Sequence, residues 1–310
     1  MNPIEIRKIS KRFKETLAVD SLTLDVKKGE CLGLLGPNGA GKTTTIKILT
    51  NLISPTSGKA FLMGIDVTED PRKALSYVGA VVETPEFYPY LTPVEALAYL
   101  GRIRGMTPDH VKKRSNDVLR EVGLTEWKDK KIGKFSKGMK QRLAIGQALL
   151  HEPEILILDE PASGLDPRGM VEVRNIILNL KNERKTIFMS SHMLHEVQEV
   201  CDRVALMDRG KLILDGGVEE VSRRFNRGRI EVQSLLPLTA DIVDRIKKLR
   251  NVSGVEWVYT THLIVDVNGG PEEFSTLLDD IRGLGVKITS FRQVSDGLED
   301  MYMTLVRSSL

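Results

Sequence analysis

The most constraining feature of the sequence is the string GPNGAGKT at residues 36–43. It matches the phosphate-binding pattern G-x-x-x-x-G-K-[ST] at every fixed position, between a short apolar run at 29–36 and a helix-favouring segment. The glycines let the backbone curl so that its N–H groups converge on phosphate oxygens at the positive end of the next helix. The string therefore predicts a strand, a phosphate-binding loop and a helix. The alternative is a glycine-rich turn that only caps a helix.

Each part of this loop has an expected role. Lys42 is expected to reach the β and γ phosphates, and Thr43 to offer its hydroxyl to Mg²⁺. A GTPase would also need a guanine-reading N-K-x-D string, and the sequence contains none. The predicted nucleotide-binding residues of the loop are Gly36, Pro37, Asn38, Gly39, Ala40, Gly41, Lys42, Thr43 and Thr44.

A second motif, EILILDEP at residues 154–161, brings two adjacent carboxylates to the end of an apolar run. Open α/β sheets bind ligands at the C-terminal edge of their strands. Asp159 is expected to hold Mg²⁺ through its water shell, and Glu160 to act as the general base that polarises the attacking water. Pro161 is expected to keep Glu160 extended and outside the following helix. The alternative is that the two carboxylates form a solvated helix cap.

A histidine follows a third apolar run, in the string FMSSH that ends at His192. A polar side chain there is expected to point at the same γ-phosphate and to stabilise the transition state. Two alternatives are a purely structural histidine and a metal site formed by His192 with His195. No third ligand for such a metal site is recognisable nearby in the sequence.

The pattern of apolar residues predicts an α/β fold. Unbroken apolar runs, which suit parallel strands buried on both faces, occur at residues 78–82, 155–158 and 186–189. Helical spacing without a strand pattern occurs at residues 94–100, 111–122 and 139–149. Two apolar runs around a turn at residues 208–210 indicate a closing hairpin. We predict an α/β domain over residues 1–220, with a helical subdomain at about 85–150.

A new pattern starts after the basic stretch SRRFNRGR, which we interpret as a connector. The remaining residues, 221–310, scan as β-α-β-β-α-β followed by a final helix. Within them, residues 274–281 show the stripe of a helix that packs on a sheet. The order is that of a ferredoxin-like α+β domain. We therefore predict two domains, as the length of 310 residues also suggests.

Composition excludes several classes of protein. The chain has 45 Lys and Arg against 42 Asp and Glu, with the charges interspersed, so nucleic-acid binding is not expected. Its two cysteines, Cys31 and Cys201, form no CxxC pair, which favours a reducing compartment. The first residues are charged where an export signal would be apolar, and no apolar run approaches the roughly 20 residues of a membrane span. A membrane function would need another chain to cross the bilayer.

A third string, FSKGMKQR at residues 135–142, resembles the LSGGQ signature of the ABC ATPase family, and the resemblance covers roughly the first 220 residues. Ser136 is a good helix N-cap, and the N–H groups after it form an anion site. In the family this site binds the γ-phosphate of ATP held by the opposite subunit. Lys137 and Met139 depart from the signature, whereas Ser136 and Gly138 are retained.

Further residues fit the same family. Asp166 in SGLD resembles the residue at the subunit contact, and His192 matches the family's switch histidine. Phe13 occupies the place of the aromatic residue that stacks on adenine, although a core phenylalanine is the alternative. Glu83 stands where most members have glutamine, as in the branch of bacitracin-type and other ABC-2 exporters. Whether Glu83 binds the metal is left open.

The resemblance implies an ATPase with ATP and Mg²⁺ as cofactors, an ATP-dependent homodimer, and a separate membrane permease as partner. Such a subunit is peripheral, on the cytoplasmic face of the cell membrane. The aromatic residues Phe87, Tyr88 and Tyr90 form either a groove for a permease helix or part of the helical subdomain's core. The rival functions are a soluble ABC ATPase that acts on ribosomes or DNA, and a ligand-sensing regulator.

Overall fold

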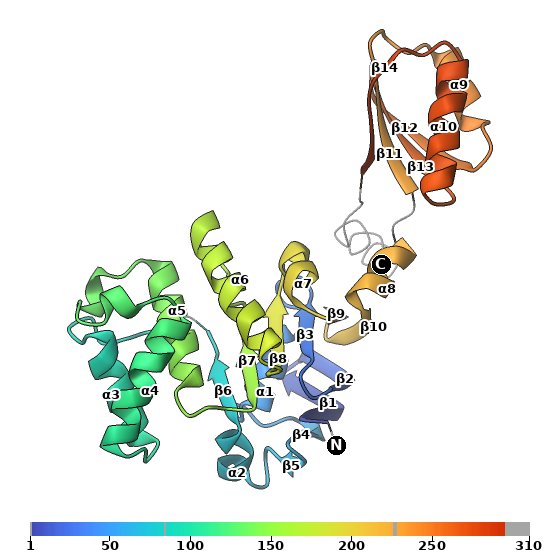
Figure 1. Cartoon of the computed structure of the whole chain (residues 1–310). Helices are drawn as coiled ribbons and strands as arrows, with labels where there is room; N and C mark the ends of the chain where they lie inside the picture. The colour runs from blue at the N-terminus through green and yellow to red at the C-terminus, as the bar shows by residue number, and fades with distance from the viewer. Residues whose placement is uncertain (1, 84, 226–227, 295–310) are drawn as a thin grey trace. The chain divides into compact units, whose positions relative to one another are not determined.

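The computed structural model describes residues 2–83, 85–225 and 228–294. The chain divides into two compact units, Met1–Val218 and Glu219–Leu310 (Figure 1). Within the described ranges, no helix combines the length and the apolar character that crossing a membrane requires.

A six-stranded sheet forms the centre of the first unit, with the order β10-β9-β3-β8-β7-β6. The five strands from β9 to β6 run parallel, and β10 pairs antiparallel with β9. The predicted parallel strands and the closing hairpin are therefore confirmed. Because β3, β8 and β7 are neighbours, their C-terminal ends meet at one edge. The bounds are β3 Cys31–Leu35, β6 Val78–Val81, β7 Ile155–Leu158, β8 Thr186–Ser191, β9 Arg203–Asp208 and β10 Lys211–Gly217.

A second, antiparallel sheet with the order β2-β1-β4-β5 belongs to the same unit. The pattern of apolar residues did not predict this sheet. Where β1 pairs with β2, register shifts interrupt the alternation of side chains between the two faces of the sheet. Its apolar residues pack on the parallel sheet and on α1. The bounds are β1 Ile4–Phe13, β2 Thr16–Val26, β4 Ser57–Leu62 and β5 Ile65–Asp66.

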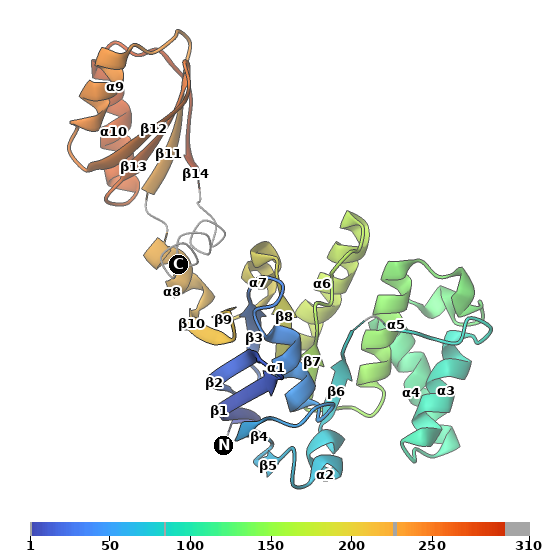
Figure 2. The same ribbon diagram turned by 180° about the vertical axis from the view of Figure 1, so that it is seen from behind.

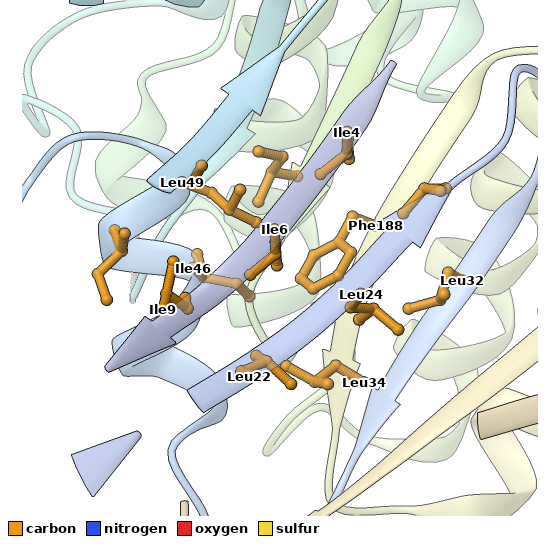
Figure 3. Packing of buried hydrophobic residues seen from close by; sticks show 14 of the residues in the cluster. Ile4, Ile6, Ile9, Leu22, Leu24, Leu32, Leu34, Ile46, Leu49 and Phe188 are labelled. Atoms are coloured by element: carbon orange, nitrogen blue, oxygen red, sulfur yellow. The ribbon is translucent and has the colours of Figure 1, made fainter. Parts of the chain in front are cut away.

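The core of the first unit lies between these two sheets (Figure 3). Ile4 and Ile6 extend from β1 toward Leu32 and Leu34 of the parallel sheet, and all four are fully buried. Phe188 of β8 lies among them and is the largest fully buried side chain. This packing fixes the strand ends that carry the candidate site.

Helices cover the parallel sheet, and α3, α4 and α5 gather as a separate group in both views (Figures 1 and 2). All three helices lie within residues 85–150, the range predicted for the helical subdomain. Thr92 begins α3 with a capping box, because its hydroxyl accepts from Glu95 N and Glu95 accepts from Thr92 N. The bounds are α1 Lys42–Leu49, α2 Pro71–Ser76, α3 Pro93–Ile103, α4 Pro108–Glu121, α5 Lys137–Leu149, α6 Pro167–Asn182 and α7 Leu194–Val200. Two short 3₁₀ turns, Thr125–Trp127 and Ile132–Lys134, precede α5.

A half-buried histidine, His151, links this helical group to the parallel sheet. Helix α5 ends at Leu149, two residues before His151. The His151 Nε2 atom lies 3.0 Å from Val78 O, so this nitrogen carries the hydrogen of the neutral ring. Burial, aided by the cations of Arg104 and Lys185, lowers the pKa of His151 from 6.5 to about 4. The folded protein therefore holds this ring neutral.

The depressed pKa predicts a loss of stability in mild acid. Below pH 6.5 the unfolded chain binds a proton at His151 that the folded chain does not, until the pH falls to about 4. Allowing for solvent screening, the free energy of unfolding should fall by about 1 kcal/mol between pH 6.5 and 5. Urea unfolding at both pH values should show this loss, and His151→Gln should lack it. The exposed His110→Gln variant is the matched control, and an unchanged pH dependence in His151→Gln would contradict the assignment.

The second unit contains the βαββαβ order predicted from the sequence. Its sheet has the order β12-β13-β11-β14 with antiparallel neighbours, and α9 and α10 cover one face (Figure 1). Ile230, Val265 and Ile281 lie in its own apolar core. The ferredoxin-like α+β class is confirmed, and the predicted final helix lies outside the described residues. The bounds are β11 Gly228–Ser234, α9 Ala240–Lys247, β12 Val252–Tyr259, β13 His262–Val267, α10 Pro271–Gly283 and β14 Ile288–Val294.

Helix α8, Val218–Phe225, occupies the first part of the basic stretch that we interpret as a connector. Glu219 and Glu220 in its first turn favour a helix start, because carboxylates stabilise the positive N-terminal end.

Candidate functional site

The phosphate-binding loop joins β3 to α1 and needs glycine for steric reasons. Gly39 and Gly41 have φ values of +84° and +105°, a region that side chains disfavour. A Cβ atom at Gly36 would lie 2.3 Å from Met207 O, and one at Gly41 would lie 2.4 Å from Ala18 O. Both contacts are with backbone, which cannot move aside cheaply. The glycine spacing of the motif is therefore fixed by this packing.

Lys42 is the first residue of α1, and its side chain turns back into the loop. Its ammonium donates to Gly36 O at 2.8 Å and to Pro37 O at 3.1 Å. It also lies 3.3 Å from Glu160 Oε1, and the side chain is almost fully buried. A buried cation held by loop carbonyls is a ready partner for an anionic group in the loop.

The other loop residues surround Lys42. Ala40 is buried, Pro37 is half-buried, and Asn38 is exposed at the outer side of the turn. Thr43 and Thr44 are half-buried in the first turn of α1. The Thr43 hydroxyl contacts Asp159, whereas the contact expected of Thr44 with phosphate stays a prediction.

Asp159 follows β7 directly and points into the loop region. Its Oδ1 atom accepts from Ser190 Oγ at 2.5 Å and lies 3.3 Å from Thr43 Oγ1. The residue is largely buried, and among the described residues no lysine or arginine pairs with its carboxylate. Asp159 and Thr43 thus offer oxygen atoms of the kind that Mg²⁺ prefers, and the carboxylate charge has no lysine or arginine partner in the part of the chain that the structure describes.

Glu160 lies between Lys42 and His192. His192 Nδ1 donates to Glu160 Oε2 at 2.9 Å, while Glu160 Oε1 faces Lys42. The expected extended conformation is wrong, because Glu160 has a φ of +45°. The reason is local: Glu160 N donates to Ser190 Oγ and Glu160 O accepts from Ser163 N, so the chain turns at this residue.

Ser190 is a site residue that the sequence reasoning missed. Its hydroxyl holds both the Asp159 carboxylate and the Glu160 main chain. The available signal was the FMSSH string, in which Ser190 precedes His192 by two residues on the strand next to β7. For the alternative metal site, the described residues contain no group of three His, Cys, Asp or Glu side chains that could hold a metal ion, and His195 lies 3.4 Å from Glu199 of its own helix.

A cavity of about 390 Å³ opens beside these groups. It brings Thr43, Asp159 and Glu160 together with the first turn of α5. Glu83, for which the sequence left metal binding open, also lies on the wall of this cavity. The lining residues are Thr43, Glu83, Pro85, Lys137, Lys140, Gln141, Asp159, Glu160 and Ser163.

Glu83 forms an ion pair that the sequence did not suggest. It follows β6, has a φ of +65° and is 62% exposed in its side chain. Its Oε1 atom contacts the ammonium of Lys47, which lies in the last turn of α1. The Glu83 carboxylate therefore has a protein cation as partner.

Ser136, Gly138 and Asp166 form a second cluster, outside the described lining of the cavity. The Ser136 hydroxyl caps α5 by accepting from Met139 N at 3.2 Å. Asp166 caps α6 by accepting from Gly169 N at 2.9 Å. A Cβ atom at Gly138 would lie 3.5 Å from Gly169 Cα, so the starts of the two helices are in contact.

Phe13 ends β1 with nearly half of its surface exposed, at 46%. The Lys11 ammonium lies 5.1 Å from its ring centroid, and cations favour that position over an aromatic face. The alternative of a core phenylalanine is therefore wrong. A solvent-facing ring remains available for a stacking partner.

The aromatic stretch after Glu83 lines a separate groove of about 530 Å³. Tyr88 and Tyr90 are 55% and 63% exposed, and their ring centroids are 5.6 Å apart. Tyr99 of α3 borders the same groove with half of its surface exposed. Tyr88 and Tyr90 are therefore not part of the subdomain's core, and the binding of a permease helix in this groove stays a prediction.

A family model described as "ABC transporter" matches residues 19–163. The bacitracin transport ATP-binding protein BcrA of Bacillus licheniformis is 44% identical over 231 residues, covering 74% of each chain. The linearmycin resistance ATP-binding protein LnrL of Bacillus subtilis is 32% identical over 309 residues, covering 99% of each chain. Among solved structures, cbiO1 from Clostridium perfringens, part of the ABC transporter complex cbiONQ, has a TM-score of 0.65 at 28% identity, covering 73% of this chain and 94% of that one.

Proposed function

The chain belongs to the ABC transporter family of ATP-binding, ATP-hydrolysing subunits, and from this we propose that it powers an exporter whose membrane permease is a separate protein. The observation that carries the proposal is the convergence of Lys42, Asp159 and Glu160 on one phosphate-binding loop. The export direction rests on two relatives named for bacitracin transport and linearmycin resistance.

ATP would bind with its phosphates in the loop of residues 36–43 and its adenine against Phe13. The Lys42 ammonium would exchange the loop carbonyls for phosphate oxygens. Thr43 and Asp159 would hold Mg²⁺, since they supply the oxygen donors and a carboxylate charge with no lysine or arginine partner. Bound Mg²⁺ supplies charge neutralisation on the phosphates.

Glu160 would act as the general base for hydrolysis. A triphosphate is a stronger partner for Lys42 than one carboxylate, so nucleotide binding would release Glu160 Oε1 from its contact at 3.3 Å. Glu160 then accepts a proton from water as the water oxygen bonds to the γ-phosphorus and the bond to the leaving ADP oxygen breaks. His192 would keep the carboxylate oriented through its hydrogen bond to Oε2.

A second copy of the chain would complete the site. The first turn of α5 contains Lys137 and Lys140 and no acidic residue, so its N-terminus favours an anion. Ser136 and Gly138 of one chain would meet the γ-phosphate held by the other, with Asp166 near the contact. ATP binding would thus close a dimer, and hydrolysis would open it.

The permease would dock in the aromatic groove beside α3, which places the protein on the cytoplasmic face of the membrane. We take residues 1–220 as the ATPase domain and residues 221–310 as an accessory domain with its own core. Nucleic acid is not an expected partner, given the net charge of +3 over 310 residues.

Co-purification from membranes tests this partner. The tagged chain, purified in mild detergent from the membranes of its own cells, should retain a polytopic membrane protein as its permease. Tyr88→Ala combined with Tyr99→Ala should reduce recovery about tenfold, because exposed aromatic side chains dominate such contacts. Tyr259→Ala, an exposed tyrosine of the second unit, is the matched control. Recovery of ribosomes or DNA in place of the permease would overturn the transport proposal.

A further inference from the structure

Three carboxylates border the 390 Å³ cavity, and they differ in whether a lysine balances their charge. Glu160 faces the ammonium of Lys42 at 3.3 Å. Asp159 accepts only from hydroxyl groups in the described structure, those of Ser190 and Thr43. Glu83 forms an ion pair with Lys47. Two of the three negative charges are therefore balanced by lysines, and the Asp159 charge is not.

Both lysines come from α1, one from each end of it. Lys42 opens the helix inside the loop, and Lys47 lies in its last turn, where a cation is favoured by the helix dipole. Lys47 is only 31% exposed, so its position beside the cavity is defined by packing. Its ammonium meets Glu83 where the chain turns after β6 with positive φ.

A carboxylate at this position creates an electrostatic problem for the proposed function. A triphosphate carries several negative charges, and Glu83 on the same cavity wall would repel it. It would also compete with Asp159 for the divalent cation. An ion pair with Lys47 removes both effects, since the pair has no net charge.

We propose that Lys47 is a positioning residue that holds Glu83 in an ion pair during nucleotide binding, so that Glu83 is not a metal ligand and does not repel the triphosphate. The proposal rests on the proposed function, because it places nucleotide and Mg²⁺ at this cavity. It assigns the protein's metal donors to Asp159 and Thr43 alone.

The first test measures nucleotide affinity. A fluorescent N-methylanthraniloyl ATP is titrated with Mg²⁺ into the full chain carrying Glu160→Gln, which keeps the probe intact. Lys47→Gln should weaken binding about threefold to tenfold at low ionic strength, the range expected for a partly exposed charge. Lys47→Arg should keep the parent affinity within about twofold, because it preserves the charge.

The second change isolates Glu83. Adding Glu83→Gln to Lys47→Gln should restore the affinity to within about twofold of the parent, since the repelling charge is gone. Raising the ionic strength to about 0.5 M should shrink the loss caused by Lys47→Gln. A loss that persists in the double variant would mean that Lys47 acts through packing and would overturn the proposal.

The third test concerns the metal. With Glu83→Gln alone, the Mg²⁺ concentration for half-maximal probe binding should stay within about twofold of the parent. An increase of about tenfold would identify Glu83 as a metal ligand and would overturn the proposal.

A matched control variant and the parent protein together distinguish a failure of this inference from a failure of the proposed function. Lys59→Gln breaks another partly exposed ion pair in the same unit, with Asp66, and should leave probe affinity unchanged. If the Glu160→Gln parent itself fails to bind the probe, the proposed function fails. If the parent binds and Lys47→Gln binds equally well, only this inference fails.

Discussion

Glu160→Gln is expected to lower ATP turnover by about 10²–10⁴-fold while leaving ATP bound. The amide keeps the size of the side chain and an oxygen to accept from His192, but it cannot take a proton from water at neutral pH. Because hydrolysis is what separates the two chains in the proposed cycle, the variant should accumulate as an ATP-bound dimer.

Two measurements check this expectation. Phosphate release gives the turnover rate, and size-exclusion chromatography with and without ATP and Mg²⁺ gives the oligomeric state. Glu154→Gln, an exposed glutamate just before β7, serves as the matched control and should hydrolyse ATP at the parent rate. Normal turnover in Glu160→Gln would show that Glu160 is not the base.

The second large effect is expected for Lys42→Met, which should lose ATP affinity at least tenfold and turnover at least about 10²-fold. The ammonium is almost fully buried and donates to Gly36 O and Pro37 O, so no other described lysine can take its place. The methionine side chain is similar in length to that of lysine, so the substitution preserves packing in the loop.

The Lys42→Met variant needs a test of folding beside the test of function. Its circular dichroism spectrum and unfolding midpoint should stay close to those of the parent, while equilibrium binding of ATP is lost. Lys113→Met, on the exposed side of α4, is the matched control for removing one lysine. A Lys42→Met protein that binds and hydrolyses ATP normally would contradict the role of the loop.

Local patterns predicted much of the fold. The strands β3, β6, β7 and β8 were readable because each is a short run of apolar residues buried on both faces. The βαββαβ order of the second unit was readable for a similar reason, since strands and helices alternate with clear turn residues between them. The antiparallel sheet of the first unit was not predicted. Register shifts in β1 interrupt the alternation of side chains between the two faces, which is the pattern that identifies a strand.

The sequence also predicted which residues the nucleotide site needs, although not how they are held. Lys42, Asp159 and Glu160 stand in contiguous motifs, so their chemistry was evident from residue type and spacing. The positive φ of Glu160 was not evident, because it arises from hydrogen bonds with Ser190 and Ser163. Because Pro161 follows Glu160 in the sequence, we expected Glu160 to be extended.

The sequence by itself determined the α/β class, the phosphate-binding loop and the separate C-terminal α+β unit, since each depends on interactions among neighbours along the chain. Only the tertiary structure decided that Lys47 pairs with Glu83 and that Ser190 holds Asp159. These partners stand 36 and 31 residues apart, and strand order and helix packing alone bring them within bonding distance. Charge balance in the site therefore depends on packing that no local pattern encodes.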